Sequence, residues 1–103
     1  METPALTHEE FSQHANSKFQ VQIDETSVVE LELTEVSELK LRPQQEEFVI
    51  IFRGPRDKFL GQGTRSFSHP GMGQFDLFLV PISQDEQGVY YEAIFNRFRE
   101  HAG

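Results

Sequence analysis

The sequence predicts an all-β fold, mainly antiparallel and closed as a small barrel or folded as a sandwich, with a short N-terminal α-helix. Two observations predict this class. Apolar residues recur at every second position along several segments, which is typical of strands. The turns between these segments are too brief for the crossover connections that parallel strands need. At 103 residues the chain has the length of one domain, so we expect a single domain over residues 1–103.

Residues 6–16 carry the signals of a helix start. Thr7 and Glu10 have the spacing of a capping box, in which the Thr7 side chain accepts a hydrogen bond from the Glu10 amide. Leu6 precedes the cap and is placed to pack on Phe11. These signals predict a helix of about two turns. Because the helix has few apolar positions, we expect it to cover one end of the sheet rather than to fold alone.

The β core is expected over residues 18–98. Residues 18–25 and 29–34 predict two half-buried strands that pair as a hairpin, because apolar and polar residues alternate strictly in both. The segment 35–45 is less regular, and Pro43 ends it. Residues 47–53 are apolar on both faces, which indicates a central strand or one covered on both sides. Further strands are predicted at residues 64–68, 75–82 and 89–98, and the tail 99–103 should fray.

The inward positions of these strands predict the core. It should contain Phe19, Val21, Leu31, Phe48, Ile50, Leu77, Leu79, Ala93 and Phe95. The opposite faces of the last two strands are also apolar, with Phe78, Val80, Tyr90 and Ile94. Those faces need cover from the N-terminal helix, from the segment 35–45 or from another chain.

The charge balance excludes some classes of partner. Nine Lys and Arg stand against seventeen Asp and Glu, a formal net charge of -8 at pH 7. We therefore expect no nucleic acid and no anionic membrane as a partner of the surface as a whole. The chain has no cysteine, the N-terminus has no signal-peptide pattern, and no apolar run approaches the ~20 residues that cross a bilayer. We expect a soluble cytoplasmic protein.

A series of short motifs supports a family resemblance. The motifs are Phe52-Arg-Gly-Pro55, Leu60-Gly-Gln-Gly63, His69-Pro-Gly-Met-Gly73, Phe78-Leu-Val-Pro-Ile82 and Tyr91-Glu-Ala-Ile-Phe-Asn96. In this order they resemble a small uncharacterised family of bacterial single-domain proteins with the pattern F-x-G-P, L-x-Q-G, H-x-x-[LM]-G, F-L-V-P-[IV] and Y-E-A-x-F-N. The resemblance covers most of the chain and implies an association of some members with phage-tail-like genes. It implies no activity, cofactor or catalytic residue.

Four residues form a candidate binding site: His69, Glu92, Arg53 and Gln62. If the last strands pair as neighbours, these side chains can meet at one end of the sheet. A partly buried carboxylate beside a histidine or an arginine has the environment in which functional acids and bases are found. The alternative is structural. Glu92 would then accept from backbone amides or pair with an arginine, and His69 would cap the turn at Pro70-Gly71.

Other chemistries have weaker signals. The histidines His8, His14, His69 and His101 lack the spacing of metal ligands, so we expect no metal and no cofactor. No serine lies in a nucleophile elbow. The basic residues Arg53, Arg56, Lys58 and Arg65 could dock an anion or an acidic partner, or could offset the acidic charge of the chain.

These observations favour a non-enzymatic protein-interaction or assembly module, including a component of a phage-tail-like or other complex. A protein partner or self-association is expected. The alternative is a small-molecule or anion-binding domain, or a small enzyme, that uses the region of His69 and Glu92. The two hypotheses differ in the surface they require. A module of the first kind presents an exposed apolar patch or an open strand edge, and the second presents a concave pocket with convergent polar groups.

Overall fold

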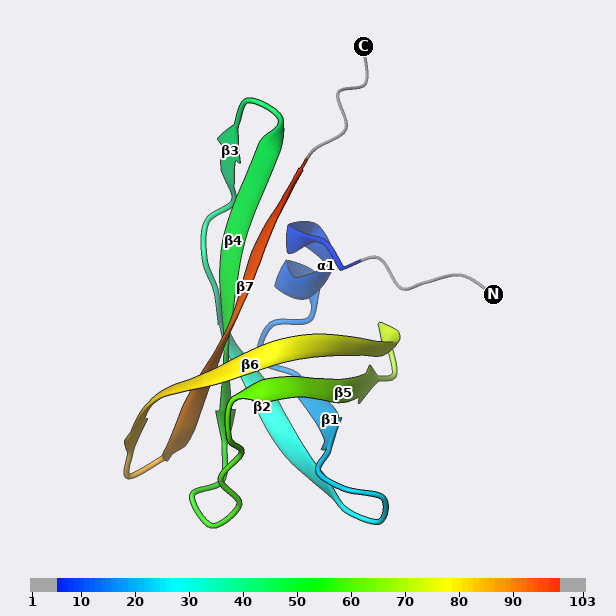
Figure 1. Cartoon of the computed structure of the whole chain (residues 1–103), viewed down its shortest axis with the longest axis vertical. Coiled ribbons are helices and arrows are strands. Elements are labelled where there is room, and N and C mark those ends of the chain that lie inside the picture. The colour runs from blue at the N-terminus through cyan, green and yellow to red at the C-terminus, as the bar shows by residue number, and fades with distance from the viewer. Residues whose placement is uncertain (1–5, 99–103) are drawn as a thin grey trace.

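The structure is a computed structural model that describes residues 6–98. Within this range one short helix precedes seven strands (Figure 1). The elements are α1 (His8–Gln13), β1 (Lys18–Gln22), β2 (Val28–Val36), β3 (Lys40–Arg42), β4 (Gln45–Gly54), β5 (Gly63–His69), β6 (Gly73–Asp85) and β7 (Gly88–Phe98). The predicted tail, 99–103, lies outside the described residues.

The strands form one antiparallel sheet that closes on itself. Their order is β2-β1-β5-β6-β7-β4-β3, and β2 also pairs with β4. The second pairing joins the two sides of the sheet, so six of the described strands make a closed barrel. The predicted all-β antiparallel class and the short helix are confirmed, and the structure resolves barrel against sandwich in favour of the barrel.

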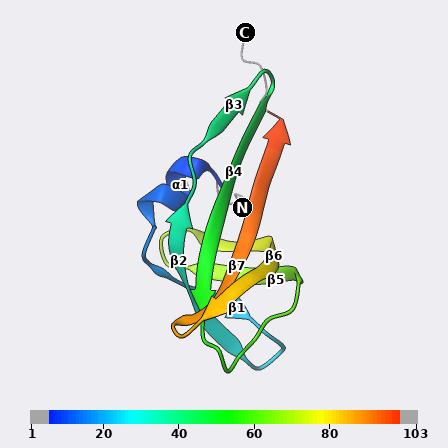
Figure 2. The same ribbon diagram turned by 90° about the vertical axis from the view of Figure 1, so that its left-hand side faces the viewer.

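One end of the sheet extends beyond the barrel. β2 pairs with the second half of β4, whereas β3 pairs with its first residues, Gln45–Glu47. β7 follows β4 over its whole length. Figure 2 shows β3, the start of β4 and the end of β7 rising together past the barrel. The segment 35–45, expected to be irregular, therefore contains a strand. Pro43 lies in the turn between β3 and β4. β3 is formed by its backbone pairing with β4, and such pairing cannot be predicted from the spacing of apolar residues.

The helix is shorter than its signals predict. The Glu10 amide donates to the Thr7 hydroxyl at 3.1 Å, which is the predicted cap. The helix ends at Gln13, and Asn16 adopts a left-handed conformation with φ of 68°. Its amide donates to the Leu33 carbonyl at 2.7 Å, and this bond turns the chain into β1. Phe11 is fully buried against Phe48, Phe75 and Phe95, so α1 covers an open end of the barrel, as predicted.

The core follows the period-two pattern of the strands. Eight of the nine residues predicted for it are buried: Phe19, Val21, Leu31, Phe48, Ile50, Leu77, Leu79 and Ala93. Phe95 is partly buried, and its ring stacks on that of Phe48 with centroids 4.6 Å apart. The core also includes Tyr91, whose hydroxyl accepts from the Leu60 amide at 2.9 Å. That bond fixes the loop before β5 against the barrel.

A matched pair of phenylalanines tests this core. Phe48 is 1% exposed and Phe78 is 52% exposed. Phe48→Ala should lower the free energy of unfolding by about 3–5 kcal/mol, because it opens a cavity among packed rings. Phe78→Ala should change it by about 0.5 kcal/mol or less, as at other exposed sites. Urea unfolding followed by circular dichroism measures both, and equal losses would contradict the assignment of inside and outside.

Candidate functional site

His69 ends β5 and turns into a small cluster of polar and aromatic groups. Its Nδ1 atom lies 2.9 Å from the Gly71 amide nitrogen, and its Nε2 atom lies 3.0 Å from the Ser17 hydroxyl. Since a backbone amide can only donate, Nδ1 is the acceptor. In the neutral ring Nε2 then carries the proton and donates it to the Ser17 Oγ atom. The Ser17 hydroxyl in turn donates to the His14 carbonyl.

This arrangement is the reverse of a serine–histidine catalytic pair. A general base needs a free lone pair directed at the serine proton. Here the lone pair of His69 faces the Gly71 amide, and the Ser17 proton is directed at the His14 carbonyl. The two side chains therefore hold backbone groups in place, and the geometry supports the structural role that the sequence left open for His69.

The His69 cluster, consisting of His14, Ser17, Phe19, His69 and Gly71, joins three parts of the chain. The ring of His69 lies 4.7 Å from that of His14 and 4.3 Å from that of Phe19, between centroids. A Cβ atom at Gly71 would collide with the His14 ring, so the turn after β5 packs closely on the residue that caps α1. Partial burial, and then the nearby His14, lower the pKa of His69 from its ordinary value of 6.5.

The other three candidate residues do not join His69. Gln62 precedes β5 and is exposed, at the opposite end of that strand from His69. Seven residues of strand separate them by about 23 Å. Glu92 lies on the outer face of β7, with its side chain directed away from the core, whereas His69 has the parity of the buried Phe67. The expected meeting of the four side chains does not occur, because alternation places them on different faces.

Arg53 and Glu92 do share a face. Arg53 pairs with Tyr90 across β4 and β7, and Ile51 pairs with Glu92 one step further along. The Arg53 guanidinium donates to Glu32 on β2, so its charge is already compensated. In the described part of the chain the Glu92 carboxylate has no hydrogen bond or ion pair. The proposed anchoring role of Glu92 therefore has no contact to support it.

The other charged groups in the described part of the chain do not form an anion-binding or metal-binding site. Arg65 donates to the Gly61 carbonyl at 2.9 Å. The depression beside Arg53 is lined by two cations, Lys18 and Arg53, and each of them is paired with a glutamate, Glu30 or Glu32. Across residues 6–98 no three His, Asp or Glu side chains are arranged to hold a metal ion. In the same range no helix is long and apolar enough to span a membrane.

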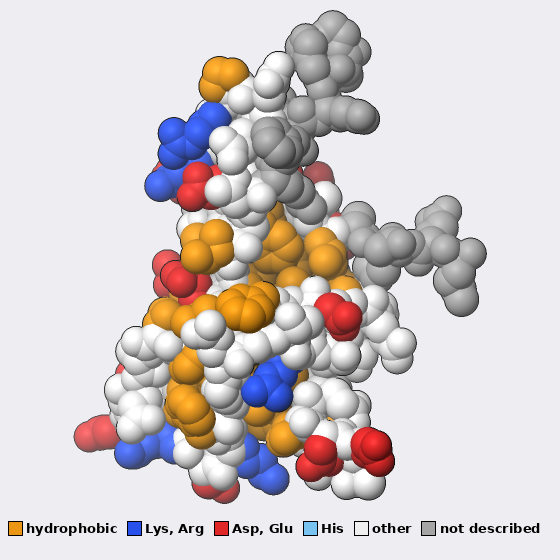
Figure 3. Space-filling model, in the orientation of Figure 1, with side chains coloured by type: hydrophobic (Ala, Val, Ile, Leu, Met, Phe, Trp, Pro, Cys, Tyr) orange, Lys and Arg blue, Asp and Glu red, His pale blue; other side chains and the backbone are white. Residues whose placement is uncertain are grey.

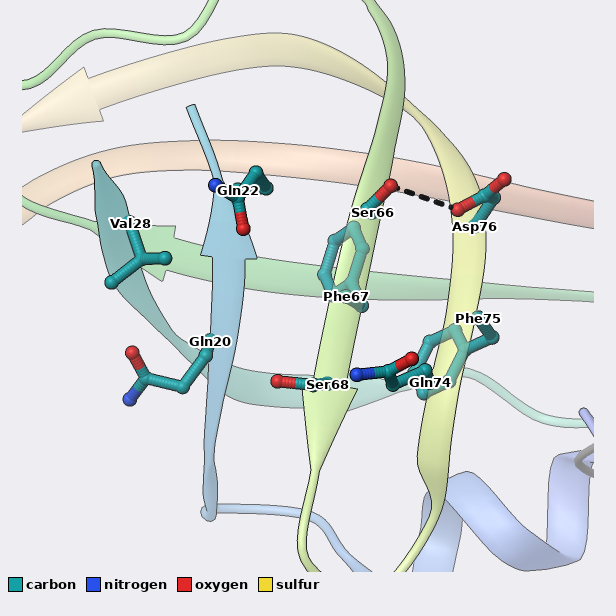
Figure 4. A pocket seen from close by; sticks show the side chains of 9 residues that line it. All are labelled: Gln20, Gln22, Val28, Ser66, Phe67, Ser68, Gln74, Phe75 and Asp76. Carbon is teal, nitrogen blue, oxygen red and sulfur yellow. Dashed lines mark hydrogen bonds between the residues drawn. The ribbon is translucent and has the colours of Figure 1, made fainter. Parts of the chain in front are cut away.

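A polar depression lies where β1 and β5 diverge. The two strands pair only through Gln20 with Ser68 and Val21 with Phe67. Figure 4 shows Gln22 on β1 and Ser68 on β5 beside this depression, whereas Gln20 is directed away from β5 and Ser66 toward Asp76. The depression has a volume of about 480 Å³. Some of its polar groups already have partners: Ser66 donates to Asp76 at 3.1 Å, and Gln20 donates at 3.2 Å to Glu30, which lies outside the depression. The surface has neither an exposed aromatic ring nor a pair of titratable groups for chemistry.

The outer face of β4, β7 and β6 is the most distinctive surface. Here Val49 lies beside Ile94, and Ile51, Glu92 and Val80 form the next row across the three strands. Ile94 is 60% exposed, and Ile82, in the β6 bulge, is 47% exposed. We call this surface the apolar outer face and define it by Val49, Ile51, Phe78, Val80, Ile82, Tyr90, Glu92 and Ile94. It contains a shallow depression of about 390 Å³ that also reaches Glu35 on β2.

Nothing in the described part of the chain covers this face. α1 packs on inward residues of the barrel, on the other side of the sheet. Figure 3 shows hydrophobic side chains exposed in a band along β6. The sequence predicted that Phe78, Val80, Tyr90 and Ile94 need cover. It also predicted that residues 47–53 form a strand that is central or covered on both sides. β4 is central, since it pairs with β7 on one side and with β2 and β3 on the other, and its outward residues Val49 and Ile51 are half-buried. Ile82 lies on this same side, as alternation from Phe78 and Val80 places it, although the sequence analysis did not single it out.

The lowered pKa of His69 gives a pH prediction. As pH falls, the unfolded chain binds a proton at 6.5, before the folded protein does. The contribution of this histidine to the free energy of unfolding is constant well above that pH. It then becomes unfavourable as pH drops through 6.5 toward the folded-state pKa. Between about pH 7.5 and 5.5 the wild type should lose more stability than His69→Asn, whose amide oxygen can still accept from Gly71. The free energy of unfolding is measured by chemical denaturation at each pH. An equal loss in the wild type and in His69→Asn over this range would contradict the prediction.

Comparison with known proteins places the chain in a family. A family model described as a domain of unknown function (DUF6916) matches residues 6–95. No curated protein and no solved structure gives a match. The matched range runs from the residue before the helix cap to the last core strand, and so includes the barrel, the His69 cluster and the apolar outer face. The chain therefore belongs to the DUF6916 family.

Proposed function

We propose that this protein is a non-enzymatic interaction module that binds another protein through the apolar outer face. The observation that carries the proposal is the row of exposed aliphatic and aromatic side chains on paired strands. Phe78, Ile82 and Ile94 are each about half exposed or more. Complete burial of one such side chain is worth about 1.5–3 kcal/mol. A partner that covers this face gains that energy on a rigid surface, because the side chains stand on a closed sheet.

The context of the proposal is an assembly in the bacterial cytoplasm. The resemblance to proteins that accompany phage-tail-like genes supports a role in a complex. The absence of cysteine supports a reducing compartment. An acidic surface with a net charge of -8 supports a protein partner over a nucleic acid.

The alternative of a small-molecule site or enzyme at His69 and Glu92 has less support. Both ring nitrogens of His69 already have partners, the Gly71 amide and the Ser17 hydroxyl, and Glu92 lies on the outer face of a different strand. None of the depressions described above contains both His69 and Glu92. The geometry therefore favours the interaction module.

A pair of charge substitutions tests the proposed function. Ile94 on the apolar outer face and Val28 at the start of β2 are both exposed, at 60% and 50%. Ile94→Asp should abolish partner binding, because it buries a charge in the interface, while Val28→Asp should leave binding intact. The measurement is quantitative affinity capture from cells that produce the protein, with the melting temperature of each variant as a control for folding.

Two results would contradict the proposal. One is a partner recovered equally with wild type, Ile94→Asp and Val28→Asp. The other is a partner lost with Val28→Asp alone, which would move the binding surface to the β1–β2 side of the barrel.

A further inference from the structure

Two carboxylates lie in one row at the apolar outer face: Glu92 within it, and Glu35 at its border on β2. Glu35 on β2 pairs with Ile51 on β4, and Ile51 pairs with Glu92 on β7. The two glutamates therefore flank Ile51 on neighbouring strands. Two strand spacings separate their backbones by about 10 Å. Both side chains border the same shallow depression.

A bulge in β2 produces this arrangement. Leu33 is fully buried, so strict alternation would direct Glu35 to the core as well. The register shifts between Leu33 and Glu35, which turns Glu35 outward and Val36 inward against the core. The chain thus gains a second carboxylate on this face without burying a charge in the barrel.

Neither carboxylate is compensated by a side chain of residues 6–96, the range over which side chains are described. Glu35 and Glu92 have no ion pair or hydrogen bond there. The cation nearest in register, Arg53, donates to Glu32. Glu92 is half-buried between Ile51 and Val80 in its row. Among the described side chains, therefore, no cation and no hydrogen-bond donor compensates these two carboxylates.

The charges restrict what can cover the face. A purely apolar partner would remove both carboxylates from water with nothing in return, which is costly. A second copy of this chain, docked on the same face about a two-fold axis, would bring four carboxylates into one interface. A partner with lysine or arginine can replace the lost hydration with charge-assisted hydrogen bonds. The net charge of -8 also attracts a basic segment from a distance.

We propose that the partner is a basic, aliphatic segment of a different protein, with lysines or arginines that reach Glu35 and Glu92 while its apolar side chains pack on Ile51 and Ile94. This inference rests on the proposed function and specifies the chemistry of the occupant. The apolar contacts supply binding energy, and the two ion pairs select a basic segment over neutral and acidic ones.

Synthetic peptides test the charge requirement. The probe is a dodecapeptide of alternating leucine and lysine, compared with peptides in which glutamine or glutamate replaces every lysine. Binding is measured by fluorescence anisotropy, and the site is mapped by amide chemical shifts. The lysine peptide should bind at least tenfold more tightly than the glutamine peptide and shift Val49, Ile51 and Ile94. The glutamate peptide should not bind. Equal binding of the lysine and glutamine peptides, or no binding of either, would overturn the inference.

A matched pair of double variants separates specific pairing from general attraction. Glu35→Gln with Glu92→Gln removes the two carboxylates of the face. Glu9→Gln with Glu25→Gln removes the same charge from exposed positions on α1 and the β1–β2 turn. The first pair should weaken binding of the lysine peptide at least tenfold, and the second should weaken it less than threefold. Equal weakening by both pairs would overturn the inference.

The experiments separate failure of the basic-partner inference from failure of the proposed function. If capture depends on Ile94 but the bound segment is neutral or acidic, the interaction module stands and the basic partner is wrong. If light scattering shows a dimer that Ile94→Asp dissociates, the occupant is a second copy and the inference is again wrong. If capture does not depend on Ile94, the proposed function itself fails.

Discussion

The pairing of β2 with β4 is the contact on which the rest of this structure depends. It joins the two sides of a twisted sheet and closes the barrel. Closure fixes which residues of β4 lie inside, and these are Phe48, Ile50 and Phe52, all buried. The residues between them must then point outward, because side chains alternate along a strand. A slip of one residue would exchange the two sets. The register of the β2–β4 pairing therefore determines both which residues form the core and which form the apolar outer face.

Much of this fold could be predicted from the sequence because apolar alternation survives in most strands. The inward rows of β1, β2, β6 and β7 match the predicted core. The predictions failed where backbone geometry interrupts alternation. The bulge beside Glu35 reverses the direction of the side chains that follow, and no residue type indicates it in the sequence. The short β3 strand, fully exposed, has no apolar pattern at all and is defined only by its hydrogen bonds to β4.

The candidate site shows the limit of reasoning from residue types. His69, Gln62, Glu92 and Arg53 could meet only if the strands that hold them were neighbours. In the structure β6 separates β5 from β7, and the residues also lie on different faces and at different ends of their strands. The apolar face predicted from Phe78, Val80, Tyr90 and Ile94 was found, since it follows from the same alternation as the core. Glu35 joined Glu92 through a bulge, so their proximity required the structure.

The central claim is that the apolar outer face touches a partner protein, and site-specific photo-crosslinking in the producing cell tests it most directly. A photoreactive amino acid at position 94 would stand on the apolar outer face, and the same group at position 28 would stand on the far side of the barrel. The account predicts a cross-link from position 94 to one protein, within a segment that contains lysine or arginine, and none to that protein from position 28. A partner protein that is cross-linked from position 28 and not from position 94 would contradict it.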